Sequence, residues 1–120
     1  MAVAIGDAVI AFVSGTASIV NSETRHVGDA ARQTEQTLEN IERLIGAENF
    51  AAHNLAGAGA RLSDMAAVRV YVKRPEDYPK CKAESEKRLG EAPVIYVVAD
   101  ICRPELLVEI EGVAFSQRTL

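Results

Sequence analysis

Two glutamates near the C-terminal end of the chain have a spacing that suits acid–base chemistry. Glu109 and Glu111 lie two residues apart within the alternating stretch Leu106–Phe115. Side chains two apart in a β-strand project from the same face, so both carboxylates would share one side of a sheet. If that side packs against another surface, burial raises the pKa of a carboxyl group and suits it to general acid or base catalysis. If that side is open to solvent, the pair is ordinary surface charge, and the spacing alone favours this second interpretation.

Basic residues that could bind an anionic substrate are spread over the second half of the chain. A second alternating stretch places Arg69, Tyr71 and Lys73 on one strand face. Arg69 and Lys73 are therefore the stronger cationic candidates for contacts with a carboxylate substrate, and Tyr71 on the same face is a candidate substrate-binding residue as well. Lys82 is kept as a further candidate substrate-binding residue, whereas most of the remaining cations are expected to be solvated surface charge.

Nucleophilic, metal and cofactor chemistry are not indicated by the residue pattern. The Ser14-Gly15 pair lacks the surroundings of a nucleophile elbow. The cysteines Cys81 and Cys102 have no histidine at a metal-ligand spacing, and two isolated thiols are typical of a reducing compartment. We therefore expect neither a metal nor a cofactor.

Composition places the chain among ordinary globular domains. Its 120 residues are 48% hydrophobic, which is enough for one domain with one core. The formal net charge of −4, with no basic cluster, argues against nucleic acid as a partner. No apolar run approaches the roughly 20 residues that span a bilayer, and we expect no signal peptide, since the first residues lack a basic stretch. We expect a cytoplasmic protein without membrane contacts.

Hydrophobic periodicity predicts the elements that would position the candidate residues. Alternation and apolar runs predict strands at residues 8–14, 67–73, 94–99 and 106–115. Amphipathic or charged stretches predict helices at residues 30–45, with Asp29 as N-cap, and 75–89. We expect a loose tail from residue 116. This order predicts an α+β fold, in which two helices cover one face of a mixed, mostly antiparallel sheet.

The stretch Val94–Ala99 raises the question of what covers the sheet. It is apolar at every position, so we expect a central strand that is buried on both sides. If both helices lie on one face, the opposite face needs another cover. The pattern favours association with a second subunit or domain, and the alternative is a long loop folded over that face.

Three stretches together resemble the Rid (reactive-intermediate deaminase) family, and they cover nearly the whole chain. Rid domains carry an FVSGQ-like strand, a VYV strand and a VEIE ending in this order. The matching stretches here are Phe12–Ala17, Ala67–Val72, and Gly90–Pro93 continuing to Val108–Ala114. The resemblance implies a Rid-like, chorismate-mutase-like fold. It also implies a homotrimer with sites in the clefts between subunits, which would cover the open sheet face.

Two departures from the Rid pattern bear on the activity. Rid deaminases place an arginine two residues after the proline of a PAR motif, where it binds the substrate carboxylate, and here that position is Ile95. Thr16 also stands where those enzymes have glutamine or a similar residue. We expect no other cation near Ile95, and this counts against imine deamination.

Further stretches of the sequence are similar to the C-terminal half of chorismatases. The matching stretches are Ser14–Val20, His26–Asp29 with Gln33-Thr34, and Ala99–Glu111. Chorismatases cleave the enolpyruvyl ether of chorismate and release pyruvate with 3-hydroxybenzoate, 4-hydroxybenzoate or a dihydrodiene carboxylate. The resemblance implies that residues 1–120 form a single Rid-like domain, equivalent to the catalytic half. Chorismatases also have an N-terminal half, so the chain is either a fragment or a free-standing relative.

The chorismatase resemblance implies roles for individual residues. Glu109 matches the catalytic glutamate, which protonates the methylene carbon of the enol ether. A general acid of this kind must hold its proton near neutral pH. Gly15 and Val98 match positions that help to separate hydrolysing from aromatising subtypes, and Gly15 favours the hydroxybenzoate-forming kinds. Two alternatives remain: a Rid-type imine or enamine hydrolase with an altered site, and a non-enzymatic ligand-binding trimer.

Overall fold

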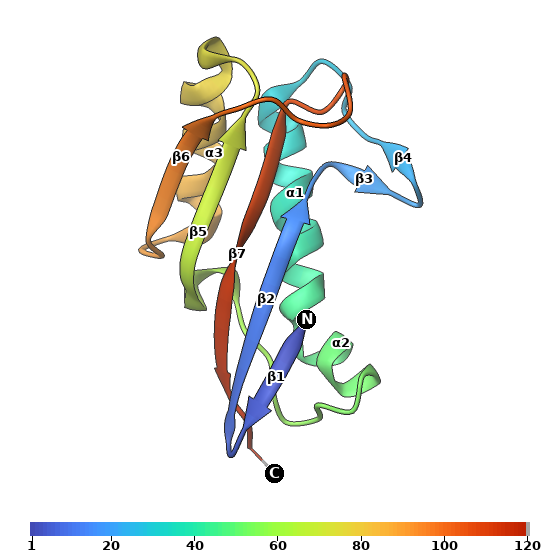
Figure 1. The fold of residues 1–120 in the computed structure, drawn as a ribbon, viewed down its shortest axis with the longest axis vertical. Coiled ribbons are helices and arrows are strands. Elements are labelled where there is room, and N and C mark those ends of the chain that lie inside the picture. Colours follow the sequence, from blue (N-terminus) through green and yellow to red (C-terminus); the bar gives the residue numbers. More distant parts are fainter. Residues whose placement is uncertain (120) are drawn as a thin grey trace.

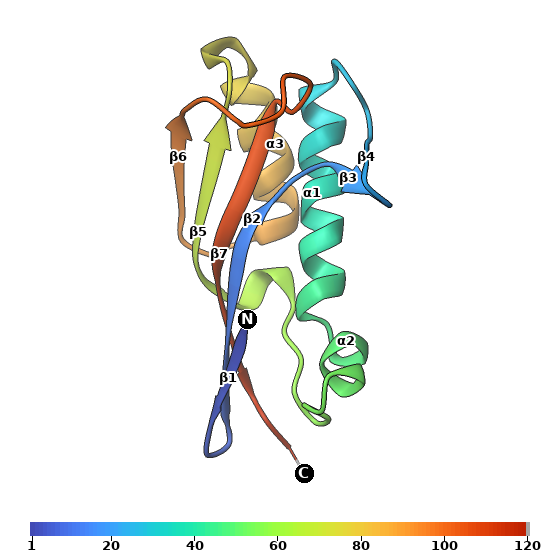
Figure 2. The same ribbon diagram turned by 45° about the vertical axis from the view of Figure 1, so that its right-hand side comes forward.

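The computed structural model describes residues 1–119 and contains a five-stranded sheet with all its helices on one side (Figures 1 and 2). In spatial order the strands are β1 (Ala2–Ile5), β2 (Ala8–Thr16), β7 (Val108–Gln117), β5 (Met65–Val72) and β6 (Val94–Val98). Every neighbouring pair is antiparallel except β5 and β6. A separate small hairpin consists of β3 (Ile19–Val20) and β4 (Glu23–Thr24).

Two long helices cover one face of the sheet, as Figure 2 shows. They are α1 (Ala30–Ile45) and α3 (Tyr78–Leu89), and the short α2 (Ala47–Ala52) follows α1 directly. The predicted α+β fold is therefore confirmed, including the mostly antiparallel sheet and the one-sided helices. None of the helices among residues 1–119 is long and apolar enough to cross a membrane.

The sequence of α1 accounts for its start and its packing. The Asp29 carboxylate accepts a hydrogen bond from the Arg32 backbone N–H at 3.0 Å, which satisfies one free donor of the first turn. Leu38, Ile41 and Ile45 lie on the face that packs on the sheet, and each is at most 1% exposed.

The prediction that Val94–Ala99 is a central strand buried on both sides is wrong. The crossover through α3 returns the chain parallel to β5 on its outer side, so β6 lies at the edge of the sheet. Its residues Ile95 and Val98 are 63% and 54% exposed. The central position belongs to β7, which pairs with β2 on one side and β5 on the other.

Both ends of the chain contain regular pairing that the sequence pattern did not predict. The first residues form β1, an edge strand hydrogen-bonded to β2. The expected loose tail is wrong for residues 116–119, because β7 continues to Gln117 and the Thr119 N–H donates to the Gly57 carbonyl at 2.9 Å. Leu120 lies outside the described residues.

A buried glutamine on α1 connects the helix layer to the start of β7. Gln33 is fully buried, and its amide nitrogen donates to the His26 and Glu105 carbonyls at 3.2 and 2.9 Å. Its amide oxygen accepts from the Leu107 N–H at 2.8 Å. One side chain therefore satisfies three backbone groups and holds Leu107, which directly precedes β7 and lies two residues before Glu109.

Replacing Gln33 by leucine tests this role, because leucine has a similar size and no hydrogen-bonding group. The change leaves the Leu107 N–H and two carbonyls without their partner, and we expect the free energy of unfolding to fall by about 2–4 kcal/mol. Urea denaturation measures it. The matched control is Glu35→Leu at an exposed position of the same helix, with an expected change within about 0.5 kcal/mol. Equal effects for the two variants would contradict the assigned role.

Candidate functional site

The face of the sheet opposite the helices carries the candidate residues. Glu109 and Glu111 of β7 both project from this face, since Val108 and Ile110, which alternate with them, are buried toward the helices. In register, Tyr71 lies opposite Glu109 and Arg69 lies opposite Glu111. The strand alternation therefore brings four polar side chains from two adjacent strands together on one surface.

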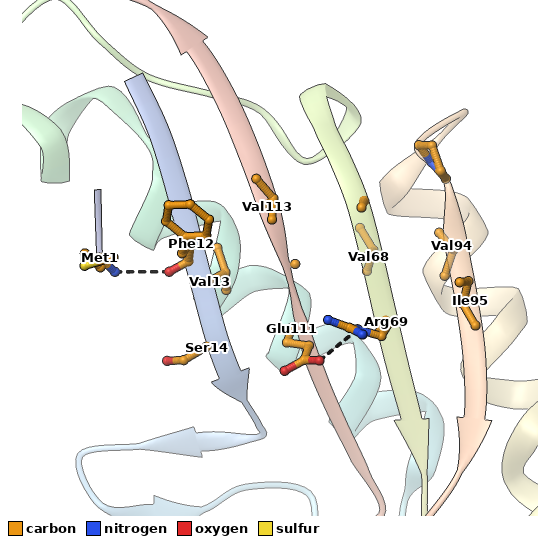
Figure 3. A pocket seen from close by; sticks show the side chains of 13 residues that line it. Met1, Phe12, Val13, Ser14, Val68, Arg69, Val94, Ile95, Glu111 and Val113 are labelled. Atoms are coloured by element: carbon orange, nitrogen blue, oxygen red, sulfur yellow. Dashed lines mark hydrogen bonds and ion pairs between the residues drawn. The ribbon is translucent and has the colours of Figure 1, made fainter. Parts of the chain in front are cut away.

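A broad open hollow of about 880 Å³ lies on the same face (Figure 3). Arg69, Glu111 and Ser14 form its polar part. Apolar side chains line the remainder, and Figure 3 labels Phe12 and Val113 on one side and Ile95 on the other. Phe12 and the neighbouring Phe115 are 44% and 52% exposed. An apolar hollow with a few converging polar groups is typical of a small-molecule site.

Glu111 is the centre of a hydrogen-bonded network on this face. Its Oε1 accepts from the Tyr71 hydroxyl at 2.6 Å and forms an ion pair with Arg69 Nε at 2.9 Å, which Figure 3 shows. The hydrogen bond to this carboxylate raises the pKa of the Tyr71 phenol, because phenolate formation would place two anions side by side. The Arg69 side chain is 61% exposed, so its terminal guanidinium nitrogens remain accessible to an anion.

Glu109 lies between Tyr71 on β5 and a bulge in β2. The pairing of β2 with β7 shifts by one residue between Val13 and Thr16. The shift brings Gly15 next to Glu109, and a Cβ atom added to Gly15 would lie 2.9 Å from the Glu109 carboxyl carbon. Within residues 1–119 the Glu109 carboxylate has no hydrogen bond or ion pair to a protein group. It is therefore available to an incoming molecule.

The helix layer positions the segments on both sides of Glu109. Asn40 of α1 donates to the Ala17 and Ile19 carbonyls, both at 3.0 Å, and so holds the chain that follows Gly15. Gln33 holds the segment before β7. Two amide side chains from one helix therefore fix the backbone around the candidate acid.

Two of the predicted substrate-binding residues lie apart from this cluster. Lys82 is on α3, on the helix-covered side, where its Nζ lies 3.8 Å from Glu86. Val98 pairs with the buried Val72, so its side chain belongs to the helix-covered face, whereas Val97 pairs with Tyr71 on the open face. The structure thus groups Glu109, Gly15, Arg69 and Tyr71 and separates Lys82 and Val98 from them.

The expectation that no cation lies near Ile95 is wrong. The parallel pairing of β5 and β6 places Arg69 directly beside Ile95, and both residues line the same hollow. The sequence could not reveal this, since the two residues are 26 positions apart and their adjacency depends on the strand register. The sequence also did not indicate that Arg69 and Tyr71 would both bind Glu111. Alternation alone would allow either glutamate to accept them.

Metal ligands do not converge within residues 1–119, where no three histidine, cysteine or acidic side chains are placed to hold an ion. The two thiols are unpaired, with Cys81 buried and Cys102 exposed.

Comparison with known proteins gives the class to which this arrangement belongs. No family model matches the sequence. The 3-aminoacrylate deaminase RutC of Acinetobacter baylyi is 33% identical over 108 residues, a match that covers 88% of this chain and 78% of that protein. The chain therefore belongs to the RutC group of Rid proteins, as the resemblance in its motifs predicted.

The chain is also similar to chorismatases. A chorismatase of Streptomyces rapamycinicus is 50% identical over 103 residues, which cover 85% of this chain and 30% of the relative. A solved chorismatase structure matches with a TM-score of 0.84 and 39% identity, over 88% of this chain and 32% of the other. The chain thus spans about three-tenths of the length of the chorismatases that it matches.

The close approach of Gly15 and Glu109 predicts the effect of a single methyl group. In Gly15→Ala the added Cβ would displace the Glu109 carboxyl group, while the backbone at Gly15 has no positive φ and tolerates alanine. Because the displaced group is the end of a flexible side chain, we expect the free energy of unfolding to change by less than about 1 kcal/mol.

A crystal structure of the Gly15→Ala variant measures the displacement, with Ser14→Ala as the control in the same strand. The expected result is a changed side-chain rotamer of Glu109 in the first variant alone. An unmoved carboxylate in Gly15→Ala would contradict the packing described above.

Proposed function

We propose that this chain is a chorismatase-type catalytic domain, which cleaves the enolpyruvyl ether of chorismate to give pyruvate and 3-hydroxybenzoate, 4-hydroxybenzoate or both. The observation that carries the proposal is the unpartnered Glu109 carboxylate above Gly15, on an open face beside a large hollow. The similarity to relatives named chorismatase supports the substrate.

In the proposed reaction Glu109 acts as the general acid. It transfers its proton to the methylene carbon of the enol ether, which leaves an oxocarbenium-like centre at the ether carbon. Water adds to this carbon and gives up a proton, which restores the acid. The proton of the added hydroxyl then passes to the ether oxygen as the bond between that oxygen and the former enol carbon breaks, which releases pyruvate and a dihydroxylated cyclohexadiene carboxylate. Loss of one ring hydroxyl as water, together with a proton from the neighbouring ring carbon, gives the hydroxybenzoate. A carboxylic acid placed for such proton transfer contributes roughly 10²–10⁴-fold to the rate.

Substrate carboxylates would be bound by Arg69. Its Nε is committed to Glu111, but the terminal nitrogens point into the open hollow and supply two donors in a planar arrangement. Tyr71 would contact the substrate through its phenolic oxygen as an acceptor, since its proton is donated to Glu111.

We further propose that the open face is covered in the active protein, either by two more copies in a homotrimer or by an additional N-terminal half. The exposed apolar residues of this face, among them Phe12, Phe115, Ile95 and Val97, support a cover. Covering would remove water from the Glu109 carboxyl group, and desolvation favours the neutral form of a carboxylic acid. The unpaired thiols support a reducing, cytoplasmic location.

Glu109→Gln tests the assigned acid, because glutamine keeps the shape and has no acidic proton. We expect at least roughly a 100-fold loss of kcat for pyruvate release from chorismate, with unchanged unfolding. Chromatography identifies the hydroxybenzoate products. Glu91→Gln, an exposed glutamate in the loop before β6, is the matched control and should retain full activity. Full activity of the Glu109 variant would show that another group is the acid.

Light scattering tests the homotrimer. We expect three times the monomer mass for the parent chain and dissociation in Phe115→Asp, since a charge on the buried face carries a large desolvation cost. Leu44→Asp, a similarly exposed apolar residue on α1, is the control and should remain trimeric. A monomeric parent chain would exclude the trimer and leave the additional N-terminal half as the proposed cover.

Imine or enamine hydrolysis is a second candidate function, favoured by the position of Arg69. It lies beside Ile95, the position at which Rid deaminases have their carboxylate-binding arginine, and the chain is 33% identical to a 3-aminoacrylate deaminase. Ammonia release from 3-aminoacrylate in the absence of chorismate turnover would support this activity over the first. A non-enzymatic trimer would show neither reaction.

A further inference from the structure

The Tyr71 hydroxyl has two carboxylates within reach and donates to only one of them. Glu109 lies directly opposite Tyr71 in the β5–β7 pairing, and Glu111 lies diagonally, two residues further along β7. Opposite and diagonal neighbours are both accessible to a long aromatic side chain. The structure shows a 2.6 Å hydrogen bond to Glu111.

Arg69 explains this preference for the diagonal partner. It lies opposite Glu111, and its Nε binds the same Oε1 that accepts the Tyr71 proton. A carboxylate held by a guanidinium group stays ionised and is a strong, fixed acceptor. A tyrosine hydroxyl has one proton, so the bond to Glu111 leaves none for Glu109.

We propose that Glu111 is a positioning residue, which holds the Tyr71 hydroxyl proton away from Glu109 and so keeps Glu109 able to carry and deliver its own proton. This inference rests on the proposed role of Glu109 as general acid. A hydrogen bond from Tyr71 to Glu109 would stabilise the ionised carboxylate, so a smaller fraction of Glu109 would hold a proton at neutral pH.

The charged and titratable groups near Glu109 come from two strands. On β5 and just beyond it they are Tyr71, Arg69 and Lys73, and the Lys73 amine is bound to the Arg103 and Pro104 carbonyls. On β7 the group is Glu111, while β2 contributes only uncharged residues at the bulge. Tyr71 is thus the neutral donor directly opposite Glu109 in the β5–β7 pairing, while the β2 hydroxyls at the bulge are those of Ser14 and of Thr16, which donates to the Ser14 carbonyl.

Two substitutions of Glu111 separate its charge from its hydrogen bond. Glu111→Gln removes the charge but keeps an oxygen that accepts from Tyr71. Glu111→Leu removes both and frees the hydroxyl for Glu109. Each is made in the parent chain and in a Tyr71→Phe background, which lacks the hydroxyl. The lost charge and the released Arg69 act in both backgrounds, so comparison of the two backgrounds cancels their effects.

The direct measurement is ¹³C NMR of the chain labelled at glutamate carboxyl carbons, with Glu109→Gln identifying the Glu109 signal. We expect Glu109 in Glu111→Leu to titrate at lower pH than in Glu111→Gln. In the Tyr71→Phe background the two variants should titrate together. The same midpoint for both variants in the presence of Tyr71 would overturn the proposal.

Activity gives the second readout. A general acid loses activity as pH rises through its titration, so a lower midpoint moves this fall to lower pH. At neutral pH we expect kcat for Glu111→Leu to be about fivefold below that of Glu111→Gln, the ratio that one net hydrogen bond produces. Tyr71→Phe should abolish the difference, which loss of packing alone would not do.

The two readouts distinguish the failure of each idea. If the NMR midpoints differ as expected but Glu109→Gln remains fully active on chorismate, the positioning role stands and the proposed catalytic role fails. If Glu109→Gln is inactive but the midpoints coincide, the catalytic role stands and the positioning role fails.

A tyrosine titration provides an independent check of the donor. The bond to Glu111 raises the pKa of Tyr71. Glu111→Leu in a Glu109→Gln background, where no second carboxylate can take up the hydroxyl, should therefore lower this pKa toward its ordinary value near 10. Ultraviolet difference absorbance at about 295 nm follows the change, and Tyr71→Phe removes the contribution of this residue from that of the other two tyrosines. An unchanged Tyr71 titration on adding Glu111→Leu to Glu109→Gln would contradict the hydrogen bond on which the proposal depends.

Discussion

The buried amide of Gln33 is the interaction on which the rest of the site depends. From within the helix layer it satisfies three backbone groups in two segments, at His26 and at Glu105 and Leu107. Leaving any of these buried groups without its partner would be costly. By holding Leu107, which directly precedes β7, Gln33 constrains which residues of β7 face the helices. A one-residue shift in this register would turn Glu109 into the core.

Asn40 has the matching effect on the other side of the site. By binding the Ala17 and Ile19 carbonyls it holds the end of β2, where the bulge brings Gly15 against Glu109. The catalytic candidate is thus on one face of the sheet and its supports are on the other. A rigid helix layer with directed hydrogen bonds leaves the open face free for the proposed substrate and the proposed covering surface.

The open face combines apolar side chains with an ordered arrangement of polar groups, which is unusual for a surface exposed to solvent. Its aromatic and β-branched side chains suit a buried interface, and its polar groups are arranged so that Glu111 is paired whereas Glu109 is unpaired. Glu109 and Glu111 lie on the same face of one strand but have different environments. Arg69 lies opposite Glu111, whereas Tyr71 lies opposite Glu109. This difference is the basis for assigning them the different roles of positioning residue and acid.

The sequence by itself determined the local features: the amphipathic α1 with its Asp29 cap, the shared face of Glu109 and Glu111, and the fold class. These follow from periods of 3.6 and 2 residues and from short-range capping, which act within one element. Only the tertiary structure decided that β6 lies at the edge, that Arg69 lies beside Ile95, and that Lys82 and Val98 belong to the other face. Strand order and register depend on contacts between residues far apart in the chain, for which alternation within one strand carries no information.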